Sequence, residues 1–116
     1  MKKRKKQCPE REQVKQRLTY RIMLEKEYTE GCAAWMVDRM GALIDHMQYG
    51  HALIAYKRQN GEFRLAKATL VYYERIFGRP YSLISAQKGT LVYWDVEAQG
   101  WRNLLIENFL EWRPVV

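Results

Sequence analysis

Residues 51–116 alternate apolar and polar positions in short runs, which is the period of half-buried strands. Two of these runs, 51–58 and 62–70, lie on either side of Asn60-Gly61. Asn and Gly tolerate the positive φ that a tight hairpin turn requires, whereas β-branched residues do not. We therefore expect a tight antiparallel hairpin at this position.

A second hairpin is predicted where runs at 91–96 and 101–106 flank the loop Glu97-Ala98-Gln99-Gly100. Residues 107–109 follow as about one helical turn, and a fifth short strand begins at Leu110. Two hairpins, a single-turn break and a final strand are the chain order of a five-stranded SH3-like β-barrel. The sequence therefore predicts such a barrel over residues 51–116.

A helical period precedes the strands, over residues 9–50. The first predicted helix, 9–30, starts at Pro9, which suits the first turn of a helix, and Gly31 ends it. A second helix then runs to about Gln48, with its apolar residues on one face: Ala33, Met36, Val37, Met40, Leu43, Ile44 and Met47. The fold class is therefore α+β, with a two-helix N-terminal hairpin before the barrel.

We expect the two helices to differ in how much of their surface is buried by other parts of the protein. The apolar arc of the first helix is interrupted by Arg17 and Arg21, so this helix should be half covered, with Arg21 pairing with Glu25 one turn away. The stripe of the second helix fits packing on the barrel, packing on the first helix, or docking to a partner. A homo-oligomer would form through its Met36, Met40, Leu43 and Met47 face.

Charge is concentrated at the N-terminus of this chain of 116 residues. The net charge is +7, and the run Lys2, Lys3, Arg4, Lys5 and Lys6 carries five of these charges, which leaves +2 for the rest. We expect residues 1–8 to be a basic disordered tail. Such a tail is either a solvated arm or an electrostatic anchor for nucleic acid or anionic lipid.

Several classes of protein do not fit the sequence. The longest apolar run, 32–37, is far too short to cross a bilayer, and no apolar region of a signal peptide follows the tail. Cys8 and Cys32 form no C-x-x-C motif, so we expect two free thiols in a reducing compartment and no disulfide. We expect a cytoplasmic protein with no membrane partner, no metal and no cofactor.

An enzyme is not expected either. His46 and His51 are the only histidines available as bases near neutral pH; His46 is predicted on the polar face of the second helix, and His51 begins a strand. Ser82 and Ser85 lie outside any nucleophile elbow, and the glycines have no phosphate-loop spacing.

Nucleic-acid binding is predicted from cationic residues interleaved with aromatic ones, since this combination holds phosphates and stacks bases. The candidate residues lie on the tail, on the first hairpin and on the long connection 71–88. They are Lys2, Lys3, Arg4, Lys5, Lys6, Tyr56, Lys57, Arg58, Arg64, Lys67, Arg75 and Arg79. The opposing interpretation places the rings in the core and leaves the cations as solvated surface charges.

Binding of a small anionic ligand, such as a nucleotide, is the alternative. Tyr93, Trp101 and Arg102 would supply aromatic rings and a bidentate anion donor for such a pocket. Against this, Trp101 would complete the barrel core and Arg102 would pair with Asp95 or Glu97 across the second hairpin.

A family resemblance appears in the segment Tyr93-Trp94-Asp95-Val96-Glu97-Ala98-Gln99-Gly100-Trp101-Arg102-Asn103, with Asn108 soon after. This segment resembles the Sm-like, SH3-like barrels that are grouped with WYL domains. Residues 56–64 and 66–70 are similar to the first hairpin of that family, and the resemblance covers 51–113. It implies a barrel of bacteria and their mobile elements, related to ligand-sensing or nucleic-acid-linked regulatory modules. We therefore expect a non-enzymatic, nucleic-acid-associated regulatory module of bacterial or phage origin, with ligand sequestration or protein assembly as alternatives.

Overall fold

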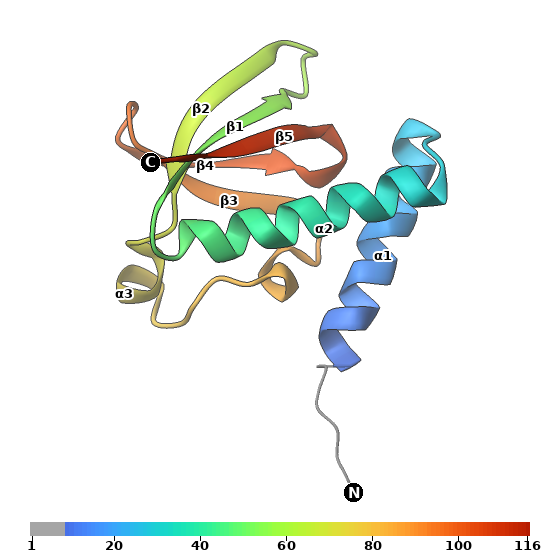
Figure 1. The fold of residues 1–116 in the computed structure, drawn as a ribbon, viewed down its shortest axis with the longest axis horizontal. Coiled ribbons are helices and arrows are strands. Elements are labelled where there is room, and N and C mark those ends of the chain that lie inside the picture. The colour runs from blue at the N-terminus through green and yellow to red at the C-terminus, as the bar shows by residue number, and fades with distance from the viewer. Residues whose placement is uncertain (1–8) are drawn as a thin grey trace, which may run out of the picture.

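The computed structural model describes residues 9–116, so the predicted tail at 1–8 lies outside the described residues. The elements are α1 (Pro9–Lys26), α2 (Glu30–Met47), β1 (His51–Lys57), β2 (Phe63–Thr69), α3 (Tyr73–Phe77), the 3-10 turn η1 (Leu83–Ala86), β3 (Thr90–Asp95), β4 (Gly100–Leu105), the 3-10 turn η2 (Ile106–Asn108) and β5 (Phe109–Val115) (Figure 1). The predicted α+β class, with two N-terminal helices and five strands, is confirmed. None of the described helices is long and apolar enough to span a membrane.

The five strands form one antiparallel sheet in the order β4-β3-β2-β1-β5. β1 pairs with both β2 and β5, and β3 pairs with β4 over its whole length. β2 and β3 pair only at Ala68–Asp95 and Thr69–Trp94. The first half of β2 therefore separates from β3, and η2 joins the two outer strands, β4 and β5.

The first predicted hairpin is present, with β1 and β2 paired antiparallel across Asn60-Gly61. The N–H of Arg58 donates to the carbonyl of Glu62 at 2.8 Å, which leaves Gln59, Asn60 and Gly61 as the loop. Of these three residues only Gly61 has a positive φ, at +90°, and the Asn60 side chain accepts a hydrogen bond from the N–H of Glu62. The predicted hairpin is therefore confirmed, and the positive φ that it requires is supplied by Gly61 alone.

The break between the two helices lies earlier than the sequence suggested. α1 ends at Lys26, Glu27 adopts a left-handed φ of 59°, and α2 begins at Glu30. The Thr29 side chain accepts a hydrogen bond from the N–H of Cys32, so it caps the first turn of α2. The expectation that Gly31 ends the first helix is therefore wrong, since Gly31 lies within the capped turn.

The apolar stripe of α2 lies in the core that the helices and the sheet share, and all seven of its predicted residues are buried. Figure 1 shows α2 lying across one side of the sheet, with α1 beside it. The side chains of Met36, Met40, Leu43 and Met47 are at most 4% exposed within the single chain. Of the alternatives, the stripe therefore packs within the chain, and these four side chains are not available for a homo-oligomer contact.

Arg21 links α1 to η2 through an ion pair with Glu107 instead of pairing within its own helix. Its Nε donates to Oε1 of Glu107 at 2.8 Å, and a terminal amino group donates to Oε2 at 3.2 Å. Glu107, in η2, is only 6% exposed. The expected pair of Arg21 with Glu25 is therefore wrong: a buried carboxylate accepts two charge-assisted hydrogen bonds, which an exposed i,i+4 neighbour does not match.

Two buried tyrosines, Tyr81 and Tyr93, make the free energy of unfolding sensitive to alkaline pH. The hydroxyls of Tyr56 and Tyr93 lie 2.7 Å apart, and burial together with this hydrogen bond raises the pKa of Tyr93. Burial also raises the pKa of Tyr81 to about 12. An unfolded tyrosine loses its proton near pH 10, so the unfolded state binds fewer protons than the native state above that pH.

We expect the free energy of unfolding to be constant just below pH 10 and to fall as the pH rises toward 12. The slope should be about 1.4 kcal/mol per pH unit for each tyrosine that stays protonated only in the native state. Urea titrations at several pH values measure this slope. Tyr81→Phe removes one of these groups and should give a shallower slope. An unfolding free energy that stays flat to pH 12 would contradict the assignment.

Candidate functional site

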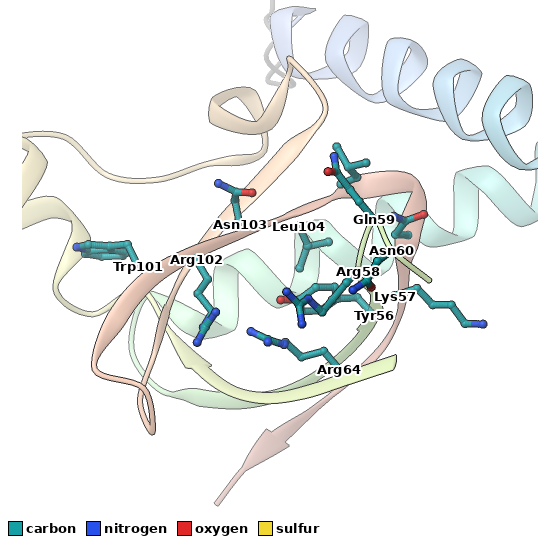
Figure 2. A pocket seen from close by; sticks show the side chains of 12 residues that line it. Tyr56, Lys57, Arg58, Gln59, Asn60, Arg64, Trp101, Arg102, Asn103 and Leu104 are labelled. Carbon is teal, nitrogen blue, oxygen red and sulfur yellow. The ribbon is translucent and has the colours of Figure 1, made fainter. Parts of the chain in front are cut away.

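A groove with a volume of about 540 Å³ opens where β2 separates from β3, between the β1–β2 hairpin and β4. Figure 2 shows its two walls. One wall is lined by Tyr56, Lys57, Arg58, Gln59, Asn60 and Arg64, and the other by Trp101, Arg102, Asn103, Leu104, Leu105 and Asn108. The volume is within the range of sites for small molecules.

Cationic side chains dominate the charge of this groove, which we call the cationic groove. Four of its lining residues are Lys or Arg, and none is Asp or Glu. In Figure 2 the guanidinium ends of Arg58, Arg64 and Arg102 reach toward the same region, whereas Lys57 extends outward. Three like charges that converge without a carboxylate between them leave a site that favours an anion.

Two of these arginines form ion pairs with carboxylates that do not line the groove. Arg58 pairs with the exposed carboxylate of Glu62 at 3.2 Å, and Arg102 pairs with Asp95 at 2.9 Å. Neither Arg64 nor Lys57 forms an ion pair within residues 9–116, so their charges are available to a ligand.

Asp95 positions Arg102 through both of its carboxylate oxygens. Oδ1 accepts hydrogen bonds from the N–H groups of Glu97 and Ala98, at 3.0 and 2.9 Å, which fixes the loop of the second hairpin. Oδ2 accepts the hydrogen bond from Nε of Arg102. The predicted pair of Arg102 with Asp95 is confirmed. Because the pair uses Nε, the two terminal amino groups of the guanidinium stay available to an anion.

Trp101 lies at the rim of the groove and is half-buried. Its ring contacts the rings of Trp94, Phe77 and Tyr73, with centroid distances of 5.2, 5.4 and 5.8 Å. The ring packs against the edge of the hydrophobic core rather than inside it. Trp101 therefore joins the groove to an aromatic cluster.

Residues predicted for two alternative sites line the same groove. Tyr56, Lys57, Arg58 and Arg64 come from the nucleic-acid set, and Trp101 and Arg102 come from the small-ligand set. Tyr93 does not line the groove, because it is fully buried with its hydroxyl bonded to Tyr56. Tyr56 is itself only 3% exposed, so it supports the floor of the groove rather than offering a free ring.

Three predicted cations lie elsewhere among the described residues. Lys67 is in the second half of β2, Arg75 is in α3, and Arg79 follows α3. Lys2, Lys3, Arg4, Lys5 and Lys6 lie outside the described residues.

Four carboxamides also line the groove, and none of them was predicted as a site residue from the sequence. The hairpin loop contributes Gln59 and Asn60, β4 contributes Asn103, and η2 contributes Asn108. Each carboxamide both donates and accepts hydrogen bonds, which is what the edge of a nucleobase requires. Their sequence signal is weak, because Asn and Gln are ordinary residues in turns.

Comparison with known proteins identifies one family. The sequence model described as WYL_2, Sm-like SH3 beta-barrel fold, matches residues 40–110. The matched range runs from α2 into β5 and includes every residue that lines the cationic groove. No curated protein and no solved structure matches the chain significantly.

Proposed function

This chain belongs to the WYL_2 family of Sm-like SH3 β-barrels, and on that premise we propose that it is a non-enzymatic module that binds nucleic acid in the cationic groove. Such barrels are small domains that are generally non-catalytic. The observation that carries the proposal is the lining of the groove, in which converging arginines, four carboxamides and the rim indole of Trp101 occur without any carboxylate. The resemblance to WYL domains further supports a regulatory role in a bacterium or one of its mobile elements.

Each part of the groove matches one part of a nucleotide. Guanidinium groups bind phosphate oxygens in pairs and release condensed counterions as they do so. The half-buried indole of Trp101 at the rim would give a base a flat surface on which to stack, and the carboxamides would reach the hydrogen-bonding edge of the base. Because no carboxylate lines the groove, the charge of its lining residues favours a phosphate that enters it.

A second candidate function is the binding of a small anion such as a mononucleotide, which the volume of about 540 Å³ favours. The two functions differ in their dependence on ligand length. A groove that serves a polymer should bind an oligonucleotide more tightly than a mononucleotide, because each further phosphate releases counterions. A site for a small ligand should bind both equally.

Trp101→Ala tests the groove through its aromatic contact. We expect this change to weaken the binding of a fluorescein-labelled single-stranded oligonucleotide by about tenfold, since stacking on one aromatic ring contributes about 1–3 kcal/mol. Because the ring is half-buried, the variant should remain folded, with an unfolding free energy lower by about 2 kcal/mol. Fluorescence anisotropy measures the affinity, and urea denaturation measures the stability.

The matched control is Trp35→Ala, because Trp35 is 49% exposed on α2 and does not line the groove. The control should bind the oligonucleotide as the wild type does. A Trp101→Ala variant that is folded and binds with unchanged affinity would rule out the groove as the binding site.

A further inference from the structure

The connection between β2 and β3 presents aromatic rings to solvent. Its short helix α3 contains no buried residue. Tyr72, Ile76 and Phe77 are 39%, 55% and 48% exposed. A contiguous group of exposed apolar side chains marks an interaction site, whereas single scattered ones do not.

These rings are held in fixed orientations by their neighbours. Tyr72 meets Trp94 edge to face, with centroids 5.8 Å apart at an interplanar angle of 78°. Tyr73 and Phe77 lie 4.5 Å apart at 33°. Such contacts stabilise each ring pair, so a ligand would not need to order the rings when it binds. We call Tyr72, Tyr73, Phe77 and Trp94 the aromatic platform.

Trp101 makes the aromatic platform continuous with the cationic groove. It lines the groove, and its ring contacts Phe77 at 5.4 Å and Trp94 at 5.2 Å. Figure 2 shows Trp101 at the end of the groove, next to the pale-yellow connection that carries α3. A ligand that leaves the groove past Trp101 therefore meets the platform next.

Two cations lie on the same connection as the platform. Arg75 and Arg79 are exposed, and neither forms an ion pair within the part of the chain that the structure describes. Glu74 is the acidic residue of α3. Rings with unpaired guanidinium groups beside them match the alternation of base and phosphate along a nucleic-acid strand.

We propose that the aromatic platform is a second binding segment, on which a single-stranded nucleic acid continues after it leaves the cationic groove. This inference rests on the proposed function of the groove. An unpaired base presents both flat faces to protein rings, whereas a base inside a duplex is already stacked on its neighbours. The platform therefore selects single strands over duplexes, and it acts only on a strand long enough to cover both segments.

Oligothymidylates of two lengths test this inference, one of about 4 nucleotides and one of about 12, which span the usual range of strand length bound by one small barrel. The wild type should bind the longer strand at least tenfold more tightly than the shorter one, and more tightly than a duplex of the same length. The double variant Tyr72→Ala/Phe77→Ala should lose about tenfold or more of its affinity for the longer strand and keep its affinity for the shorter one. Tyr49→Ala is the matched control, because Tyr49 is 92% exposed and lies after α2.

Arg79→Glu gives a second test that leaves all the rings in place. It should weaken binding of the longer strand and flatten its salt dependence, with no effect on the shorter strand. If both variants bind the longer strand as the wild type does, while Arg64→Glu still weakens binding, the platform inference is wrong and the groove stands. If the wild type binds neither strand, or if Arg64→Glu has no effect, the proposed function of the groove is itself wrong.

Discussion

Replacing Arg64 with Glu should weaken the binding of a single-stranded oligonucleotide by about 10- to 100-fold near physiological salt. Arg64 lines the cationic groove and has no acidic partner within residues 9–116, so nothing in that part of the protein neutralises its charge. The substitution removes a phosphate contact and places a carboxylate where Arg58 and Arg102 converge (Figure 2). The slope of log affinity against log salt should become shallower by about 1, because fewer counterions are released on binding.

Arg113→Glu is the matched control for charge. Arg113 is exposed on β5, does not line the groove, and its substitution changes the net charge by the same amount. We expect this control to alter the affinity by less than about threefold, through long-range electrostatics alone. Equal losses in the two variants would show that net charge, rather than the groove, determines binding.

Replacing Arg21 with Ala should lower the free energy of unfolding by about 2–4 kcal/mol. The change leaves the Glu107 carboxylate, 7% exposed in its side chain, without a cationic partner. Loss of a partner from a fully buried pair costs about 3–5 kcal/mol, and the estimate here is lower because the Arg21 side chain is 37% exposed. Urea denaturation followed by circular dichroism measures the loss.

Lys15→Ala is the comparison on the same helix. Lys15 pairs with Asp38 at 3.3 Å, but the Asp38 side chain is 67% exposed, so the cost should stay below about 1 kcal/mol. Adding Glu107→Gln to Arg21→Ala should recover part of the stability, since the buried group is then neutral. An Arg21→Ala variant that loses no more stability than Lys15→Ala would show that the pair does not fasten α1.

Local sequence patterns predicted the elements of this fold well. The apolar stripe from Ala33 to Met47 has a clear helical spacing, and every predicted member is buried in the structure. The turn at Gly61 closes the first hairpin, and the loop of the second hairpin, 96–99, lies one residue before the predicted 97–100. These features depend on residues close together in the chain, so their spacing alone indicates them.

Contacts between distant residues were not predictable from the same patterns. Arg21 has an acidic residue one turn away, at Glu25, yet it pairs with Glu107, 86 positions along the chain. The pair forms because the tertiary fold buries the Glu107 carboxylate of η2 against α1, and burial is not visible in a local charge pattern. Gly31 likewise resembles a helix end in the sequence, but the cap from Thr29 starts α2 at Glu30 and places Gly31 inside its first turn.

The residues of the candidate site were mostly named in advance, but their arrangement was not. Arg64 and Arg102 were placed in two competing sites, and the structure brings them to one groove. That groove exists because β2 and β3 pair over only two residue pairs, a property of sheet curvature that no local motif records. Tyr93 was chosen for its sequence neighbours, whereas its inward position on β3 buries it.

Mapping amide chemical shifts during a titration with a single-stranded oligonucleotide tests the central claim most directly. If nucleic acid binds in the cationic groove, the amides of residues 57–60, 64 and 101–103 should shift together with the indole N–H of Trp101. The indole N–H of Trp112 should stay fixed, because it donates to the carbonyl of Arg39 at 2.9 Å, away from the groove. Shifts confined to the helical hairpin, or a groove that stays unchanged at saturating oligonucleotide, would contradict the account.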